Sequence, residues 1–329
     1  MKAVLCKEYG PAEKLVIEDI PAPSIGADGV LIEVKAAGIN FPDTLIIENK
    51  YQFKPPLPFI PGTEVAGIVK QVGETVSQVK PGDKVMGFAF VGAYAEQIVV
   101  PAASCFPMPD TFSFEEAAAF TMIYGTSYYA LKQRGQLRSG ETLLVLGASG
   151  GVGMAAVELG KLMGATVIAA GGNNDKLAVC QERGADHIVN YNDADWKDQV
   201  KQLTGGNGAD VIYDAVGGEY TQTALRCINW GGRLLVIGFA SGDIPQLAAN
   251  LTLLKSSSVV GVFWGASLAK EPEANQENFK ELFNWSMEGK IKPYVCASYP
   301  LEQVADAMNL LLQRKAVGKV VLTTDQASQ

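Results

Sequence analysis

Residues 143–162 constrain the fold of this chain more than any other stretch. They begin with the four apolar residues LLVL, continue through a turn rich in glycine and end in a run of helical character. Four consecutive apolar residues are typical of a strand that is buried on both faces. We therefore expect a strand, a tight turn and a helix in direct succession.

Small residues in this turn fit the spacing A-x-G-x-x-G, at Ala148, Gly150 and Gly153. We expect Ala148 to allow the sharp exit from the strand, Gly150 to let the backbone approach a pyrophosphate, and Gly153 to let the helix pack close to the sheet. The helix N-terminus would offer N–H groups and a positive dipole end to the phosphates. A second strand at residues 166–170 completes a βαβ unit, which favours dinucleotide binding over an ordinary strand–turn–helix.

The rest of the chain shows two patterns. Short runs rich in β-branched residues, separated by turn residues, fill the first 110 residues and are typical of an all-β, barrel-like domain. Residues 40–61 contain five prolines, and we expect a defined loop there. A helix N-terminus is expected at Ser113. From residue 143 onward strands and helices alternate, which predicts a parallel, doubly wound sheet; its further strands are expected at 187–191, 211–216, 233–237 and 259–263.

The pattern changes again after Trp264. An amphipathic helix is expected at 275–288, and β-type runs return at 291–299 and 319–322. The simplest topology returns this last part of the chain to the first domain. We therefore expect a β-rich catalytic domain of residues 1–122 and 267–329, with a Rossmann dinucleotide-binding domain of residues 123–266 inserted between its halves.

The charge balance excludes some partners. The chain has 27 Lys and Arg residues against 35 Asp and Glu residues, a formal net charge of −8. This balance argues against non-specific nucleic-acid binding and against a polybasic membrane anchor. Charges interrupt the N-terminal region where a signal peptide needs an apolar core, and no apolar run reaches membrane-spanning length. We expect a soluble, cytoplasmic protein with no nucleic-acid or membrane partner.

The metal-ligating residue types are sparse. The five cysteines lie far apart without a C-x-x-C pair, and His187 is the only histidine. Distant cysteines in odd number predict reduced thiols rather than a disulfide framework. Zinc sites draw mainly on clustered Cys and His, so we expect no metal.

The end of the second strand of the βαβ unit indicates which nicotinamide cofactor binds. Residues 171–174 read GGNN, and no carboxylate comes before Asp175. In NAD-binding units an acid at this place bonds the ribose hydroxyls, and it would repel a 2′-phosphate. Its absence favours NADPH, with Asn173, Lys176 and Tyr191 as candidate contacts to the phosphate. The alternative is that Asn174 or Asp175 only caps a helix and that Lys176 is solvated.

Several blocks of sequence together carry a family resemblance: AGINFPD at 37–43, PGTEVAG at 61–67, VKPGDKV at 79–85, GASGGVG at 147–153, GGR at 231–233 and GKVVL at 318–322. Over essentially its whole length the chain resembles the zinc-free, zeta-crystallin-like quinone oxidoreductases of the medium-chain dehydrogenase/reductase superfamily. The resemblance implies a GroES-like barrel domain holding an inserted Rossmann domain. It also implies hydride transfer from NADPH to a quinone or an α,β-unsaturated carbonyl, and a homodimer at least.

The resemblance also places candidate catalytic residues. Zinc-dependent members carry Cys and His where this chain has Asn40 and Thr63, whose amide and hydroxyl are poor zinc ligands. Hydrogen-bond donors would then have to stabilise the charge that develops on the acceptor oxygen. Asn40, Tyr51 and Thr63 are the candidates; Tyr51 is a proton donor, a cofactor partner or a half-buried loop tyrosine. Asp43 is expected to be a structural acceptor, and Leu45 departs from the tyrosine that several members carry.

The remaining cofactor contacts follow from the resemblance and from the ends of the sheet strands, where ligands of open α/β sheets bind. Thr126 would lie against the nicotinamide or be a plain helical threonine. Lys319 would reach a cofactor phosphate or be a surface lysine. The full set of expected cofactor-binding residues is Thr126, Ser149, Gly150, Gly151, Val152, Gly153, Gly172, Asn173, Lys176, Tyr191, Gly238, Phe239, Phe263, Trp264 and Lys319.

Other functions remain open at this point. An enoyl-thioester reductase acting on CoA or acyl-carrier substrates would use the same hydride and the same donors. A non-catalytic NADPH-binding protein and a zinc alcohol dehydrogenase are the further alternatives. The acceptor depends on the loops at 49–59 and around Phe263, which the sequence does not resolve. Residues 259–264 are expected to pair with the same strand of a second subunit.

Overall fold

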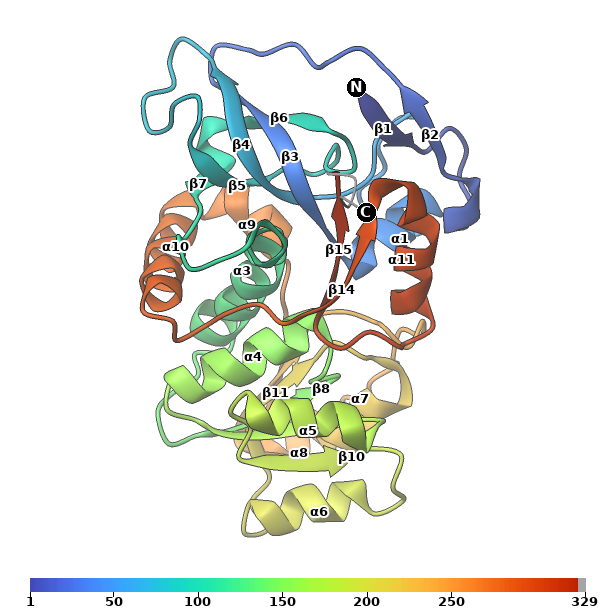
Figure 1. Cartoon of the computed structure of the whole chain (residues 1–329). Helices are drawn as coiled ribbons and strands as arrows, with labels where there is room; N and C mark the ends of the chain where they lie inside the picture. The colour runs from blue at the N-terminus through green and yellow to red at the C-terminus, as the bar shows by residue number, and fades with distance from the viewer. Residues whose placement is uncertain (325–329) are drawn as a thin grey trace. The chain divides into compact units, whose positions relative to one another are not determined.

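The chain crosses twice between two structural units in the computed structural model, which describes residues 1–324 (Figure 1). Unit 1 comprises Met1–Met122 together with the chain from Ser286 onward, and unit 2 comprises Ile123–Trp285. The sequence pattern places the return to the first unit at residue 267, whereas the structure places it at Ser286. The reason is that α10 (Pro272–Met287) packs within unit 2.

Contacts from both halves of α10 hold it there. The ring of Trp285 meets that of Tyr128 edge-on at 5.5 Å between centroids. The side-chain amides of Asn278 and Gln133 exchange two hydrogen bonds of 2.7 and 3.1 Å. Both partners lie in or directly after α3 (Thr121–Tyr129), which continues as a π-helical turn over Ala130–Arg134.

The main sheet of unit 1 is built around one long strand, β3. It pairs antiparallel with β15, β4 and β6, and the strand order along the sheet is β14-β15-β3-β4-β5-β7. A separate hairpin joins β1 and β2. The strands of unit 1 are β1 (Lys2–Leu5), β2 (Val16–Asp19), β3 (Gly29–Ile39), β4 (Glu64–Val72), β5 (Lys84–Phe88), β6 (Gln97–Pro101), β7 (Cys105–Pro107), β14 (Val295–Pro300) and β15 (Lys319–Thr323).

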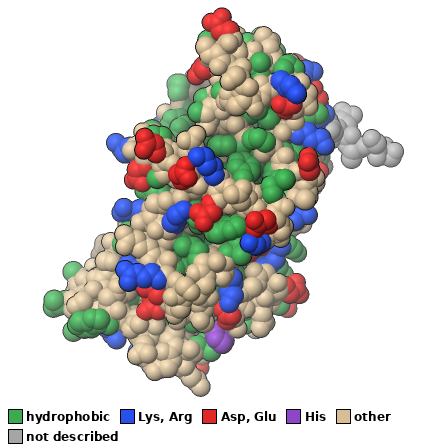
Figure 2. Space-filling view, turned by 90° about the vertical axis from the view of Figure 1, so that its left-hand side faces the viewer, with side chains coloured by type: hydrophobic (Ala, Val, Ile, Leu, Met, Phe, Trp, Pro, Cys, Tyr) green, Lys and Arg blue, Asp and Glu red, His purple; other side chains and the backbone are tan. Residues whose placement is uncertain are grey.

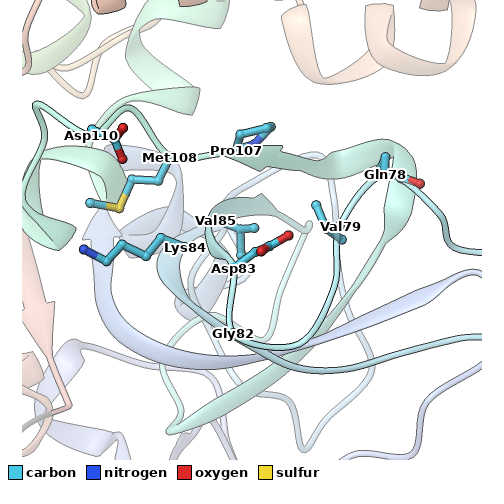
Figure 3. A pocket seen from close by; sticks show the side chains of 9 residues that line it. All are labelled: Gln78, Val79, Gly82, Asp83, Lys84, Val85, Pro107, Met108 and Asp110. Atoms are coloured by element: carbon cyan, nitrogen blue, oxygen red, sulfur yellow. The ribbon is translucent and has the colours of Figure 1, made fainter.

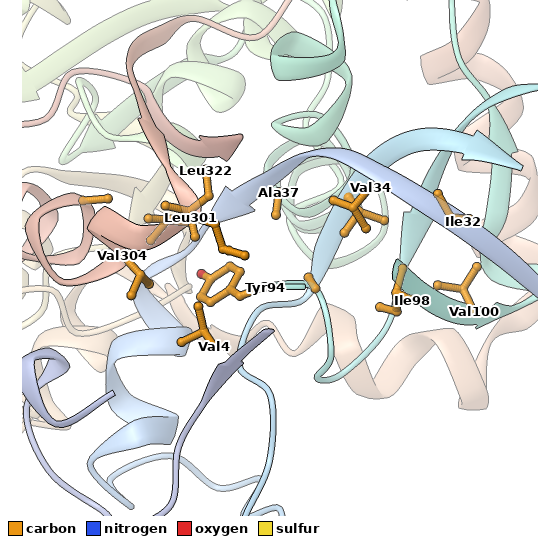
Figure 4. Packing of buried hydrophobic residues seen from close by; sticks show 14 of the residues in the cluster. Val4, Ile32, Val34, Ala37, Tyr94, Ile98, Val100, Leu301, Val304 and Leu322 are labelled. Carbon is orange, nitrogen blue, oxygen red and sulfur yellow. The ribbon is translucent and has the colours of Figure 1, made fainter. Parts of the chain in front are cut away.

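The core of unit 1 follows the two-residue period of its strands. Ile32 and Val34 of β3 are buried in the same hydrophobic cluster as Ile98 of β6 (Figure 4). Nearer the other end of the same core, Tyr94 lies beside Val4, and α11 (Val304–Leu312) covers it from the C-terminal half of the chain. The two separated segments of unit 1 therefore share one hydrophobic core.

A helix occupies the start of the segment that the prolines mark as a loop. The helix α1 (Phe41–Ile47) begins directly after Asn40 and carries Pro42 in its first turn. Proline is tolerated there because the first N–H groups of a helix have no intrahelical acceptor. The side chain of Asp43 instead accepts the N–H of Asn40 at 2.8 Å, which fixes the start of the helix.

The expected start of a helix after Ser113 is confirmed. In α2 (Phe114–Ala118) the Oγ of Ser113 accepts the N–H of Glu116 at 3.2 Å, and the Glu116 carboxylate accepts the N–H of Ser113 at 2.8 Å. This reciprocal pair satisfies two N–H groups that the first turn leaves open.

Unit 2 holds the expected parallel, doubly wound sheet. Its strand order is β10-β9-β8-β11-β12-β13, and every neighbouring pair is parallel. The order reverses between β8 and β11, which is where such sheets bind ligands. The strands are β8 (Thr142–Leu146), β9 (Thr166–Gly171), β10 (His187–Asn190), β11 (Ala209–Asp214), β12 (Ile228–Val236) and β13 (Ser258–Gly261). The helices are α4 (Gly151–Leu162), α5 (Asn174–Glu182), α6 (Trp196–Leu203), α7 (Gly218–Leu225), α8 (Asn250–Lys255) and α9 (Trp264–Lys270).

The surface carries charges of both signs. On the face shown in Figure 2, Lys and Arg side chains are interspersed with Asp and Glu. Within residues 1–324, no helix combines the length and the apolar character needed to cross a membrane.

Candidate functional site

The glycine turn of unit 2 begins with a backbone reversal at Gly147. Its φ of +69° lies in the left-handed region, where residues with a Cβ are strained. Ala148, to which the A-x-G-x-x-G spacing assigns the sharp exit, is fully buried and has no such φ. The exit from β8 therefore depends on Gly147 rather than on Ala148.

The two later glycines of the A-x-G-x-x-G spacing, Gly150 and Gly153, have different surroundings. A Cβ on Gly153 would lie 2.2 Å from the carbonyl oxygen of Gly147, so α4 packs against the turn too closely for any side chain. A Cβ on Gly150, at the N-terminus of α4, would make only ordinary van der Waals contact, 3.4 Å from the carbonyl oxygen of Gly147. The first helical bond runs from Met154 N to Gly150 O, so the amides of Gly151–Gly153 precede it. This arrangement fits a pyrophosphate cradle.

Two buried hydroxyls support the start of α4. Ser127 of α3 donates to the carbonyl oxygen of Val152 at 2.8 Å, and its Oγ lies 2.9 Å from the Tyr213 hydroxyl. Burial raises the pKa of Tyr213, which keeps its phenol neutral. The sequence reasoning missed both residues; the available signal was a hydroxyl inside an otherwise apolar helix or strand.

Amide groups surround the end of β9. Asn173 caps α5, because its Oδ1 accepts the N–H of Lys176 at 3.0 Å. The side chain of Asn192 donates to the carbonyl oxygen of Gly172 at 2.9 Å. Beside them the centroid of the Tyr191 ring lies 4.3 Å from the centroid of the Tyr220 ring. The cap of α5 is thus Asn173 rather than Asn174 or Asp175, and the asparagine and tyrosine side chains named here, at the place where a ribose-binding acid would stand, are neutral.

The other expected cofactor residues of unit 2 differ in exposure. Gly238 and Phe239 follow β12, with the Phe239 ring beside Gly217. Phe263 is 49% exposed, whereas Trp264 is 3% exposed. Trp264 donates to Asn275 at 3.0 Å and packs so closely on Gly125 that a Cβ there would lie 2.6 Å from its ring. Trp264 therefore packs between α3 and α10, and its contact with the cofactor stays a prediction.

A second polar cluster lies in unit 1, where three neighbouring strands end or begin. The pairing register places Gly38 of β3 opposite Glu64, the first residue of β4. It also places Ile39 opposite Val320, the second residue of β15. Asn40, Thr63, Glu64 and Lys319 are therefore brought together from distant parts of the sequence.

Lys319 is buried inside this cluster. It is 3% exposed, and its Nζ donates to Asn40 Oδ1 at 2.7 Å, to Ile39 O at 2.8 Å and to Glu64 Oε1 at 2.9 Å. The second carboxylate oxygen of Glu64 accepts the N–H of Met122 at 2.8 Å. All three hydrogens of the ammonium group have protein acceptors, which leaves none for a phosphate. Lys319 is thus not a surface lysine.

The side chains of Asn40 and Thr63 are joined to that ion pair. Asn40 Nδ2 donates to Glu64 Oε1 at 2.8 Å and to Thr63 Oγ1 at 3.3 Å. The hydroxyl of Thr63 is an acceptor in this contact, so its own hydrogen is directed away from Asn40. Of these two candidate donors, the Thr63 hydroxyl keeps a hydrogen to offer to an acceptor, and the Asn40 amide does not.

A buried acid lies on the other side of Asn40. Asp43 is 1% exposed, and its Oδ2 accepts the Tyr94 hydroxyl and the Asn40 N–H, both at 2.8 Å. Among the described residues its Oδ1 has no hydrogen-bond partner. Burial raises the pKa of Asp43 to about 7. Burial and the nearby negative charge of Asp43 raise the pKa of the half-buried Tyr51, whose phenol is therefore protonated at neutral pH.

Neither cluster coincides with the cavity shown in Figure 3. That cavity, of about 320 Å³, lies in unit 1 and is lined by two surface segments that contain none of the expected site residues. Its lining residues are Gln78, Val79, Gly82, Asp83, Lys84, Val85, Pro107, Met108 and Asp110.

The residues that could ligate a metal are scattered. In the part of the chain from 1 to 324, no three His, Cys, Asp or Glu side chains group as a metal site would require. The five cysteines are free, and only Cys296 is exposed. The one histidine, His187 of β10, is partly exposed and is coloured purple in Figure 2.

Comparison with known proteins identifies the family. A model of the alcohol dehydrogenase GroES-like domain matches residues 26–110, and a model of the zinc-binding dehydrogenases matches residues 151–286. The quinone oxidoreductase-like protein 2 homolog of Nematostella vectensis is 42% identical over 99% of this chain and 89% of its own length.

Solved structures agree over the whole chain. Quinone oxidoreductase of Escherichia coli complexed with NADPH is 30% identical, with a TM-score of 0.91 over 98% of this chain and all of its own. CurK enoyl reductase is 27% identical, with a TM-score of 0.88 over 98% of each chain. Together with the GroES-like and Rossmann units described above, these likenesses show that the chain belongs to the quinone oxidoreductases of the medium-chain dehydrogenase/reductase superfamily.

Proposed function

We propose that this protein transfers a hydride from NADPH to a quinone or to the β-carbon of an α,β-unsaturated carbonyl, without a zinc ion. The observation that carries this proposal is the composition of the unit 1 cluster. Where zinc-dependent relatives would need ligands, the cluster presents the amide of Asn40, whose two N–H groups are both donated to protein groups, and the hydroxyl of Thr63, which accepts one of them and keeps its own hydrogen. Such a site stabilises charge with a dipole rather than with a metal.

NADPH fits the residues of unit 2. The uncrowded backbone at Gly150 and the amides of Gly151–Gly153 would hold the pyrophosphate. Asn173, Lys176 and Tyr191 would hold the 2′-phosphate at an edge that lacks a carboxylate. When bound, the cofactor supplies the hydride. Support also comes from the E. coli relative, whose structure was solved with NADPH.

The donors in unit 1 would act on the acceptor. Hydride addition leaves negative charge on the acceptor oxygen, and the Thr63 hydroxyl would donate to it. Tyr51, protonated at neutral pH, would be the proton donor or a second hydrogen-bond donor. A Thr63→Val variant keeps the side-chain shape and removes the donor; we expect kcat to fall about 100-fold, whereas Thr63→Ser should retain most of it.

An assay of NADPH oxidation tests the proposal directly. Purified protein is given a quinone, an enone and crotonyl-CoA side by side. We expect turnover with the quinone or the enone and a higher kcat/KM for NADPH than for NADH. Preference for NADH, or tight NADPH binding without turnover of any acceptor, would contradict the proposal; the second result would indicate a non-catalytic NADPH-binding protein.

Enoyl-thioester reduction is the second candidate. It requires the same hydride and a donor to the thioester oxygen, and an enoyl reductase shares the fold over nearly the whole chain. Turnover of crotonyl-CoA exceeding that of the quinone and the enone would favour this candidate.

We also propose a cytoplasmic homodimer that extends the unit 2 sheet through β13. This strand pairs with β12, and among the described residues nothing pairs with its other edge. Val259 on β13 is 38% exposed, and Leu253 and Leu254 on α8 are 78% and 65% exposed. Exposed apolar residues beside an open strand edge favour pairing with a second copy. Light scattering should give twice the 35.0 kDa of one chain, and Val259→Lys should reduce it toward the monomer.

A further inference from the structure

The buried cluster of unit 1 contains an ion pair that the proposed chemistry does not yet use. We propose that Lys319 and Glu64 are positioning residues: they fix the side-chain amide of Asn40 in one orientation, so that the Thr63 hydroxyl keeps its hydrogen turned away from Asn40 and available to the acceptor. This inference rests on the proposed function, because it assigns Thr63 the donor role, and it adds the residues that impose that role.

The first step is the orientation of the Asn40 amide. Lys319 has only donors and lies 2.7 Å from one end of the amide, while the Glu64 carboxylate has only acceptors and lies 2.8 Å from the other end. A rotated amide would place its NH2 group against the ammonium and its oxygen against the carboxylate. The two opposite charges therefore select a single orientation, with Nδ2 toward Glu64.

The second step passes this orientation to Thr63. With Nδ2 fixed, its second hydrogen is donated to Thr63 Oγ1 at 3.3 Å. A hydroxyl that accepts from Asn40 cannot also donate to it, because Nδ2 offers no lone pair. Accepting a hydrogen bond also polarises a hydroxyl and strengthens it as a donor. The hydrogen of the Thr63 hydroxyl is thereby directed away from Asn40, and the hydroxyl becomes a stronger hydrogen-bond donor.

The third step is the rigidity of the ion pair. Lys319 and Glu64 are 3% and 1% exposed, and each ammonium hydrogen and both carboxylate oxygens have partners. The Glu64 carboxylate packs directly on Gly38, since a Cβ there would lie 2.6 Å from Glu64 Oε1. Opposite charges so confined hold each other in place, and removal of either one leaves the other unpaired.

The test is a double-mutant cycle on kcat with NADPH and a benzoquinone. Thr63→Val should lower kcat about 100-fold and Lys319→Met about 10-fold or more. Because Lys319 acts through Thr63, adding Lys319→Met to Thr63→Val should change kcat by less than about 3-fold. The Kd for NADPH, which unit 2 binds, should stay unchanged in all three variants. Losses that multiply would overturn the inference.

A matched control variant tests whether the loss of any lysine from this sheet lowers kcat, and a second variant is available if Lys319→Met does not fold. Lys70→Met removes a lysine from an exposed pair with Glu33 in the same sheet, at 2.9 Å, and should leave kcat unchanged. If Lys319→Met does not fold, the Lys319→Met/Glu64→Gln protein, which buries no net charge, replaces it in the cycle with the same expected result.

A spectroscopic readout separates this inference from the proposed function. The side-chain amide hydrogens of Asn40, assigned in NMR spectra by their loss in Asn40→Asp, should exchange slowly in the wild-type protein and quickly in Lys319→Met. Fast exchange in the wild type, or slow exchange in the variant, would overturn the positioning role whatever the activity. Unchanged kcat in Thr63→Val would instead contradict the donor assignment of the proposed function.

Discussion

The glycine turn of unit 2 and the polar cluster of unit 1 are built in opposite ways. The turn is formed by seven consecutive residues, 147–153, and its shape depends on backbone atoms and on missing side chains. The cluster is formed by side chains whose contacts span up to 280 residues of sequence. A local motif of this kind tolerates change elsewhere, whereas an assembled network depends on every strand that delivers a member. The two regions should therefore respond differently to substitution.

The largest expected effect comes from opening the buried ion pair. Either Glu64→Gln or Lys319→Met alone leaves an uncompensated charge, and we expect the free energy of unfolding to fall by about 3–5 kcal/mol. The double variant buries no net charge and should recover most of that loss. Urea unfolding of the wild type, the two single variants and the double variant measures these losses. Equal and additive losses would show that the two charges do not form a unit.

Asp43 should make the contribution of the cluster to the free energy of unfolding depend on pH, and the glycine turn should show no such dependence. Its folded pKa of about 7 lies above its unfolded value of 3.8. Its neutral form therefore favours the folded state below pH 4, and this contribution is lost as pH rises through 7. Tyr94, Tyr51, Glu64 and Lys319 are the titratable groups that face it.

The matching variant is Asp43→Asn, which stays neutral at every pH. Relative to the wild type, its free energy of unfolding should rise by up to about 4 kcal/mol between pH 4 and pH 8. Urea unfolding at a series of pH values follows the difference. A constant difference across that range would contradict the raised pKa.

The turn should respond to the smallest possible side chain. Gly153→Ala places a Cβ against the carbonyl oxygen of Gly147, and we expect a loss of about 1–3 kcal/mol in unfolding free energy. Gly150→Ala meets no atom closer than 3.4 Å, so its stability should be nearly unchanged while its Kd for NADPH rises. Equal stability of the two variants would disprove the close packing at Gly153.

The smallest expected effect concerns cofactor choice. Asn173→Asp preserves the helix cap, because a carboxylate oxygen accepts the same N–H, but it adds a charge at the end of β9. The ratio of kcat/KM for NADPH to that for NADH should fall about tenfold, or about 1.4 kcal/mol. Asn207→Asp adds the same charge in an exposed loop and serves as the control. An unchanged ratio would show that the 2′-phosphate does not bind at this edge.

The contrast between the regions also explains what could be predicted from the sequence. The strand, turn and helix at 143–162 are adjacent, so their spacing indicated the dinucleotide-binding turn, and the strand–helix alternation that follows indicated the sheet of unit 2. Asn40 and Thr63 were found through resemblance, but Glu64 and the true place of Lys319 were not, because strand pairing brings these residues together. The burial of Trp264 was not foreseen for a related reason: its partner Asn275 lies on α10, whose membership of unit 2 the sequence pattern does not show.

The account depends on hydride transfer that needs no metal ion. The most direct measurement is the rate of NADPH oxidation by a benzoquinone before and after exhaustive dialysis against a chelator, with zinc measured by elemental analysis. We predict less than about 0.1 zinc per chain and an unchanged kcat, because hydrogen-bond donors supply the stabilisation. Activity that is lost on chelation and restored by zinc would contradict the account.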